Sequence, residues 1–218
     1  MADVVGGHQR SIPAKADEAS MRMIMLLDRL KDVRRESPVA ASGRRERTAE
    51  HSWHVATSVY VLQHLAAEPL DVERAVTLAL FHDIPEIFVG DTFVYGSAVK
   101  TRQDREQSAM REFSRTPPVD IACGIMDLWE EYEYLRSAEA RFVMAVDVIL
   151  PVVLNHANLE HSSWARHHVA AAQVLSRIER VEHFSPPLAA HARALVDSAI
   201  SSGFLSTAAA ESADGNVP

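Results

Sequence analysis

The segment ARFVMAVDVILPVVLNH, from Ala140 to His156, places one carboxylate, Asp147, among apolar side chains. A helix that is apolar around most of its circumference lies inside a globular domain, where an uncompensated charge costs on the order of several kcal/mol. Arg141 cannot compensate Asp147, because their separation along a helix puts the two side chains on opposed faces. The chain must therefore bring a cation to Asp147 from elsewhere, or bind a metal there.

Helical periodicity recurs along the sequence, and no segment alternates convincingly like a strand, which predicts an all-α fold, a compact helical bundle. The first predicted helix covers about residues 17–33, and the loop RRESPVAASGRRER follows it. Thr48 and Asp71 are the predicted N-caps of the next two helices. The first helix carries an apolar stripe of Met21, Ile24, Met25, Leu27 and Leu30, and later helices are predicted at about 48–66, 71–85, 98–114, 120–135, 138–157, 164–182 and 187–202.

Length and composition favour one domain, because 218 residues with 47% hydrophobic content are enough for one core and few for two. We expect residues 17–204 to form it, with flexible ends at 1–16 and 205–218. The formal net charge of -8 argues against a nucleic-acid partner. The N-terminus lacks the apolar core of a secretory signal, and no apolar run reaches the ~20 residues that cross a bilayer. We therefore expect a cytoplasmic protein with no membrane partner.

Two histidines fall on the inward faces of predicted helices. His51 shares a face with Val55, Val59 and Leu62, and His82 is in line with Leu78. For either histidine alone, a neutral core imidazole bonded to a backbone carbonyl is the simpler interpretation. The buried carboxylate of Asp147 makes a metal-binding role for the two histidines the better interpretation.

A shared metal would account for both histidines and for the buried carboxylate. His51 and His82 with Asp83 and Asp147 form a nitrogen and oxygen set that suits a divalent transition metal, namely manganese, cobalt, iron, nickel or zinc. Water would complete the coordination.

Four segments together resemble the HD-domain metal-dependent phosphohydrolases, especially their 5'-deoxynucleotidase-like branch. They are AEHSWHVA, LFHDIPEIFVGDTF, LWEEYE and ARFVMAVD, and the resemblance covers roughly residues 25–180. It implies a compact helical bundle in which His51, His82, Asp83 and Asp147 hold the metal. No histidine occurs between Asp83 and Asp147, whereas two-metal relatives typically add histidines there, so we expect one metal ion.

The resemblance also suggests groups for the chemistry. Glu86 and Asp91 would be the catalytic acid and base, in an order that the sequence leaves open. Arg35 would bind the substrate phosphate, with Arg34 as an alternative, and Thr92 would donate a hydroxyl. Relatives often carry tryptophan after this arginine, but this chain has Glu36, a departure on the substrate side.

We thus expect a phosphomonoester hydrolase that releases phosphate from a (deoxy)nucleoside 5'-monophosphate or a similar small phosphorylated substrate. Two alternatives stay open: a specialised phosphatase of an unusual nucleotide or pathway intermediate, and a non-catalytic metal- or nucleotide-binding regulator. Retention of both Glu86 and Asp91 argues against the regulator, because a pure binder needs neither. The oligomeric state is left open between a monomer and a homodimer.

Overall fold

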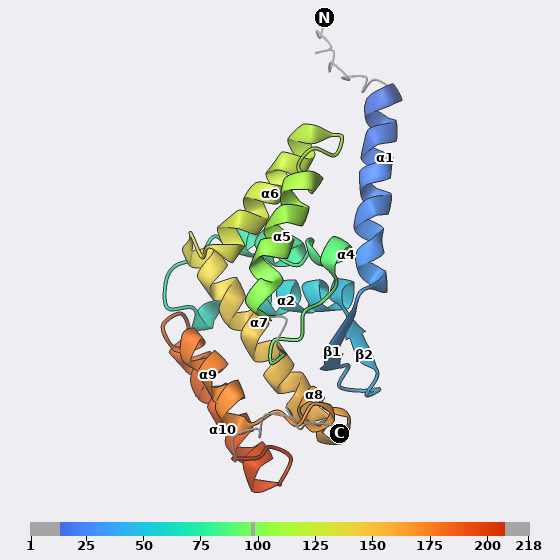
Figure 1. The fold of residues 1–218 in the computed structure, drawn as a ribbon. Coiled ribbons are helices and arrows are strands. Elements are labelled where there is room, and N and C mark those ends of the chain that lie inside the picture. Colours follow the sequence, from blue (N-terminus) through green and yellow to red (C-terminus); the bar gives the residue numbers. More distant parts are fainter. Residues whose placement is uncertain (1–13, 97–98, 208–218) are drawn as a thin grey trace, which may run out of the picture.

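The computed structural model describes residues 14–96 and 99–207, and in these ranges the protein is a helical bundle with one small hairpin (Figure 1). The all-α prediction is confirmed. The α-helices are α1 (Ala14–Asp28), α2 (Thr48–Leu62), α3 (Val72–Phe81), α4 (Glu86–Val89), α5 (Val99–Phe113), α6 (Val119–Glu133), α7 (Ala138–Ala157), α8 (Ser163–Arg166), α9 (Ala171–Glu182) and α10 (Pro186–Ser201). Short 3-10 turns η1 (Arg29–Asp32), η2 (Gln63–Leu65) and η3 (Leu159–His161) and strands β1 (Arg34–Pro38) and β2 (Arg45–Arg47) complete the order.

Helix α7 is the centre of the main core. It contacts α2, α3, α6, α9 and α10 and runs diagonally through the molecule in Figure 1. Ser137 caps its first turn by accepting a hydrogen bond from the Ala140 N–H. By length and hydropathy α7 could span a membrane, but 67% of its most apolar window is buried inside the protein. Its apolar character is therefore that of a core helix, and it fixes Asp147 deep in the fold.

A second, smaller core lies beside the first and supports α4. Met110 and Phe113 of α5 pack with Trp129 of α6 and with Ile84 and Ile87 around α4. This layer holds the α3–α4 corner against the rest of the bundle.

The α3–α4 corner turns the chain sharply after Phe81. Pro85 precedes α4, and α4 ends at Gly90, whose φ of 75° is accessible to glycine at little cost. The corner places Asp83, Glu86 and Asp91 within one short stretch that faces the same cavity.

Several local expectations were wrong. The loop after the first helix contains the antiparallel hairpin β1–β2. Thr48 is the first residue of α2 and not its N-cap, whereas Asp71 does cap α3 by accepting from the Arg74 N–H. The predicted helix over 164–182 is split into α8 and α9 around His168, whose φ is 49°. Within the first helix, Met21, Ile24 and Met25 are 59%, 56% and 65% exposed, so that stripe is only partly buried.

The expected division into residues 1–16, 17–204 and 205–218 stays a prediction, because most of both ends lies outside the described residues. Where the second end is described, Leu205 is buried in the main core and the Ser206 carbonyl accepts from the Ala171 N–H.

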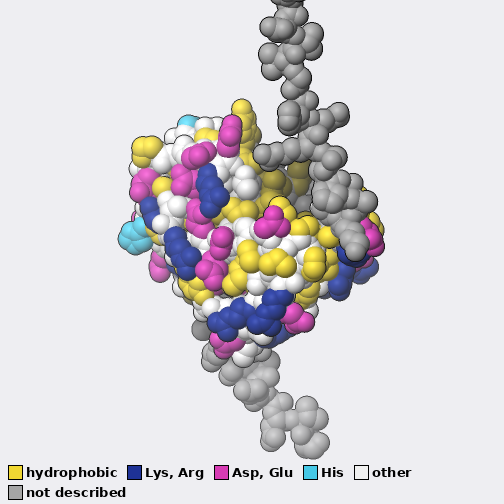
Figure 2. Space-filling model, turned by 90° about the horizontal axis from the view of Figure 1, so that it is seen from above, with side chains coloured by type: hydrophobic (Ala, Val, Ile, Leu, Met, Phe, Trp, Pro, Cys, Tyr) yellow, Lys and Arg dark blue, Asp and Glu magenta, His cyan; other side chains and the backbone are white. Residues whose placement is uncertain are grey.

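Charged side chains of both signs are interspersed on the face seen from above (Figure 2). Among the described residues of that face, Lys and Arg stand beside Asp and Glu and form no broad basic area. This distribution is consistent with the acidic composition.

Candidate active site

Two buried imidazoles define the floor of the site. His51 of α2 and His82, just after α3, are 0% and 3% exposed, and their ring centroids are 5.4 Å apart. His82 Nδ1 donates to the Ala79 carbonyl at 2.8 Å, because a carbonyl can only accept. The neutral His82 ring therefore presents the lone pair of Nε2 to the site, which is the tautomer that binds a metal.

Two carboxylates meet the imidazole nitrogens. Asp147 Oδ1 lies 2.8 Å from His51 Nε2 and 3.8 Å from His82 Nε2. Asp83 Oδ2 lies 3.1 Å from His82 Nε2 and 3.7 Å from His51 Nε2. Two nitrogens and two oxygens from α2, α7 and the α3–α4 corner thus converge on one point.

The donor set fits a divalent transition metal. Its ligand types are those that such ions prefer, and donor atoms of His51, His82 and Asp83 all lie within 4.8 Å of one another. His82 Nε2 is buried and makes no hydrogen bond, which is costly unless the nitrogen has another partner. Although burial opposes both shifts, Asp83 raises the pKa of His82, and the hydrogen bond with His51 and the attraction of both histidines lower the pKa of Asp147. Those shifts reflect a strong attraction between the four groups.

Outer groups orient these four side chains. The Tyr132 hydroxyl donates to Asp147 Oδ2 at 2.9 Å, and burial together with Asp147 raises the pKa of Tyr132. Glu46 Oε2 lies 3.4 Å from His51 Nδ1 and is buried with it. Neither residue was predicted from the sequence, although Glu46 is the inward member of the alternating triplet Arg45–Arg47 and Tyr132 belongs to LWEEYE.

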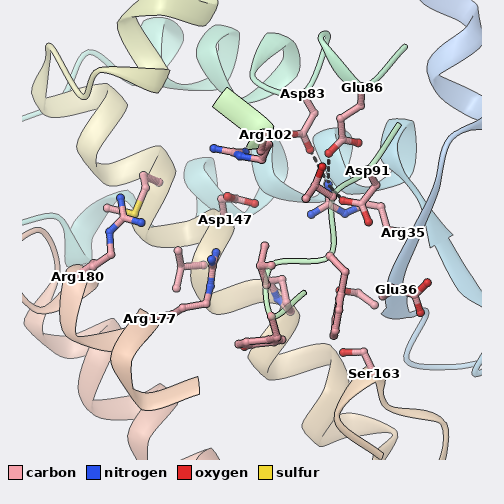
Figure 3. A pocket seen from close by; sticks show the side chains of 18 of the residues that line it. Arg35, Glu36, Asp83, Glu86, Asp91, Arg102, Asp147, Ser163, Arg177 and Arg180 are labelled. Carbon is pink, nitrogen blue, oxygen red and sulfur yellow. Dashed lines mark hydrogen bonds and ion pairs between the residues drawn. The ribbon is translucent and has the colours of Figure 1, made fainter. Parts of the chain in front are cut away.

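Arg35 of β1 lies among four carboxylates: Figure 3 shows Asp83, Glu86 and Asp91, and Glu46 Oε2 is 4.0 Å from Arg35 Nε. Its Nη1 donates to Asp83 Oδ2 at 2.8 Å and to Glu86 Oε1 at 3.3 Å, and it lies 3.6 Å from Asp91 Oδ1. The hairpin positions this arginine, while Arg34 is exposed. The position of Arg35 favours it over Arg34 as the arginine that meets the substrate.

Glu86 and Asp91 form an acidic pair on the wall of the cavity. The Thr48 hydroxyl donates to Glu86 Oε2 at 2.7 Å, so this threonine orients Glu86 instead of capping its own helix. Burial and the neighbouring Asp83 raise the pKa of Glu86. Burial also raises the pKa of Asp91, against the opposing effect of Arg35. Carboxylates with raised pKa values keep their protons to higher pH than free carboxylates do, which suits proton transfer.

A cavity of about 200 Å³ opens beside these groups. Asp83, Asp147 and Arg35 line one part of it, and Thr92, which is buried, lines it beside Asp91. Arginines that the sequence did not suggest also line the cavity: Arg102, Arg177 and Arg180. On predicted amphipathic helices such residues resemble an ordinary solvated face, so no sequence pattern distinguishes them.

Glu36 lines the same cavity and forms ion pairs with residues from other segments. It accepts from His167 Nε2 at 2.8 Å and pairs with Arg166 at 3.3 Å and with Arg45 at 3.2 Å. His167 in turn packs on Phe93, with ring centroids 4.3 Å apart. Glu36 therefore joins the hairpin to the α8–α9 segment across the substrate side of the site.

The chain matches a known family over most of its length. Residues 27–187 match the family described as HD domain. A crystal structure from Magnetospirillum magnetotacticum MS-1, described as a predicted metal-dependent phosphohydrolase, is 38% identical, with a TM-score of 0.81 over 90% of this chain and 98% of that one. A conserved hypothetical protein from Pyrococcus furiosus shares the fold at 20% identity, with a TM-score of 0.54.

Curated relatives align over a shorter stretch. The human protein named 5'-deoxynucleotidase HDDC2 is 33% identical over 129 residues, which are 58% of this chain and 62% of that protein. The Xenopus laevis protein of the same name is 29% identical over 136 residues, which are 62% of this chain and 66% of that protein. The chain thus spans just under two thirds of the length of these relatives.

Proposed function

This chain belongs to the HD-domain family, and from that membership we propose that it is a metal-dependent phosphohydrolase that releases phosphate from a (deoxy)nucleoside 5'-monophosphate. The observation that carries the proposal is the convergence of His51, His82, Asp83 and Asp147 beside Arg35. The names of the curated relatives support a nucleotide as the substrate, and the nitrogen and oxygen donor set supports the dependence on a metal.

The proposed metal ligands are His51, His82, Asp83 and Asp147, which would hold one divalent transition metal. When bound, that metal would supply Lewis-acid chemistry by polarising a phosphoryl oxygen. Tyr132 would hold Asp147 in position through its hydroxyl, and Ala79 would hold the His82 tautomer.

Arg35 is the proposed phosphate-binding residue. Its guanidinium is held by Asp83 and Glu86, so it is already oriented toward the cavity when the substrate arrives. A planar guanidinium offers several donors to phosphate oxygens. Thr92, beside Asp91 on the same wall, is the proposed hydroxyl donor to the substrate.

Glu86 and Asp91 are the proposed proton carriers. Hydrolysis forms a bond from a water oxygen to phosphorus and breaks the bond from phosphorus to the 5' oxygen of the nucleoside. One carboxylate takes the proton from the attacking water, and the protonated partner gives a proton to the leaving oxygen. The raised pKa of Glu86 suits a group that holds a proton before it is needed.

Glu36 supports a more specialised substrate as a second candidate. It places a carboxylate, held by His167 and Arg166, in the lining of the cavity. The presence of Glu86 and Asp91 argues against the non-catalytic regulator. We also propose a cytoplasmic location and a small phosphorylated partner, with no nucleic acid and no membrane.

Phosphate release tests the proposal directly. The purified protein, loaded in turn with manganese, cobalt, iron, nickel or zinc, is incubated with a panel of phosphorylated metabolites that includes all common 5'-mononucleotides. We expect phosphate release from at least one nucleoside 5'-monophosphate and its loss after chelation. Binding of nucleotides without any release of phosphate would favour the regulator and contradict the enzyme.

A further inference from the structure

The cavity has a second cationic part, separate from Arg35. Arg102 enters it from α5, and Arg177 and Arg180 enter it from α9. In Figure 3 Arg35 lies to one side of Asp147, Arg102 and Arg177 lie above and below Asp147, and Arg180 lies farthest from Arg35. We call Arg102, Arg177 and Arg180 the arginine end of the cavity.

Two of the three arginines at the arginine end have no directly contacting carboxylate in the described part of the protein. The positive charge of Arg102 is compensated by two carboxylates, because its nitrogens lie 3.6 Å from Glu106 and 3.4 Å from Glu133. Arg177 and Arg180 form no ion pair and no side-chain hydrogen bond with any residue in the described ranges 14–96 and 99–207. Glu133 is close enough to Arg180 for an electrostatic attraction, but neither arginine has a partner in direct contact in this part of the protein.

This situation differs from that of the other arginines around the cavity. Arg35 lies within 4.0 Å of four carboxylates, and Arg102 lies beside two. Arg177 is half-buried and Arg180 stands exposed at the rim. A half-buried guanidinium without a protein partner favours an anion that enters from solvent.

Resting on the proposed function, we propose that the arginine end binds a second phosphate group of the substrate, and that the substrate class is a phosphomonoester carrying two separate phosphates. The phosphate to be hydrolysed lies beside Arg35, and the other pairs with Arg177 and Arg180. Apolar lining from Leu135, Met144 and Val148 contacts the uncharged part of the molecule. A dianionic group suits two guanidinium partners better than a single negative charge does.

Matched substrate pairs test this inference. The pairs are a 2'-deoxynucleoside 5'-monophosphate and its 3',5'-bisphosphate, a nucleoside 5'-monophosphate and its 2',5'-bisphosphate, and a hexose 1-phosphate and its 1,6-bisphosphate. We expect kcat/KM to favour the bisphosphate by about tenfold to a hundredfold in at least one pair, as for added charge-assisted hydrogen bonds. A preference below about twofold in all three pairs overturns the inference.

Variants assign the preference to the arginine end. The double variant Arg177→Gln/Arg180→Gln should bring the ratio of the two kcat/KM values close to one. Arg193→Gln on α10, a partly exposed arginine paired with Glu182, is the matched control and should keep the wild-type ratio. A ratio that survives in the double variant overturns the inference, as does an equal loss for both members of the pair. If the double variant does not fold, Arg180→Gln alone is used, since its side chain is exposed.

Binding separates this inference from the proposed function. In the Glu86→Gln background, calorimetry measures the Kd of each pair without depending on turnover. Tighter binding of a bisphosphate, lost in the triple variant with Arg177→Gln and Arg180→Gln, supports the arginine end even if no substrate is hydrolysed. Equal Kd values together with phosphate release by the wild type overturn the arginine end and leave the phosphohydrolase standing.

Discussion

His51 Nε2 lies 2.8 Å from Asp147 Oδ1, although the two residues are 96 positions apart in the sequence. The contact joins α2 to α7 at the centre of the main core, and both side chains are held from behind, His51 by Glu46 and Asp147 by Tyr132. Such a buried pair is either a hydrogen-bonded ion pair that needs no other partner, or two ligands of one shared cation. The neighbouring His82 Nε2, buried without a hydrogen bond, favours the shared cation.

Metal content should depend on Asp147. We expect about one transition metal per chain in the native protein by elemental analysis. Asp147→Ala should abolish that binding and lower the Tm, because the ion ties three segments together. Asp127→Ala, on the exposed face of α6, is the control and should retain both the bound metal and the wild-type Tm. Unchanged metal content in Asp147→Ala, or two ions at full occupancy in the wild type, would contradict the single-metal site.

Tyr132 should act on metal affinity through Asp147. Tyr132→Phe removes only the hydroxyl that donates to Asp147 Oδ2. Loss of such an outer contact typically weakens metal binding by about ten- to a hundredfold, and a competition assay with a chelator measures it. Tyr134→Phe, at a partly exposed tyrosine of the same segment, should leave the affinity unchanged. Equal affinities in Tyr132→Phe and the wild type would mean that the hydroxyl does not support the site.

Glu106 should make the folded state less stable at alkaline pH. Burial, with Glu133 adding to it, raises the pKa of Glu106 to about 7 against the opposing effect of Arg102. The Glu106 carboxyl therefore keeps its proton in the folded state at pH values where the unfolded chain has lost it. Its contribution to the stability of the folded state is fully present below about pH 4.5 and is lost as the pH rises through about 7. Glu106→Gln cannot ionise, and we expect it to be more stable than the wild type by about 1–3 kcal/mol at pH 8.

Chemical denaturation at pH 5 and pH 8 measures that difference. The gain for Glu106→Gln should shrink toward zero at pH 5. Glu112→Gln, an exposed glutamate on the same helix, should show no gain at either pH. A wild type as stable as Glu106→Gln at pH 8 would show that the carboxylate is already compensated.

Burial patterns predicted correctly that the two histidines lie inside the fold. His51 and His82 were expected on inward faces, and both are buried. Asp147 was singled out because its apolar neighbours left no exposed position, and it lies in the central helix. Helical period and the cost of buried charge are local properties, so a sequence carries them without reference to the rest of the fold.

Contacts between distant segments were not predictable in the same way. Strands β1 and β2 are short and rich in charged residues, so the hairpin that positions Arg35 and Glu46 looked like a loop. Arg177 on α9 reaches the same cavity as Arg35 only because of how the helices pack. Met21 and Met25 show the converse case, since an apolar stripe is typical of a buried face but these two side chains are largely exposed. Tertiary packing decides these cases, and periodicity alone does not contain it.

The most direct test of the account is the turnover of Glu86→Gln on the best 5'-monophosphate from the substrate panel, with metal content measured on the same sample. Gln keeps the size of the side chain and its reach to the Thr48 hydroxyl but cannot carry the proton. We predict bound metal and KM close to those of the wild type, and a kcat lower by about a hundred- to ten-thousandfold. Glu73→Gln, at an exposed glutamate of α3, should keep wild-type kcat. A wild-type kcat in the metal-loaded Glu86→Gln protein would contradict the account.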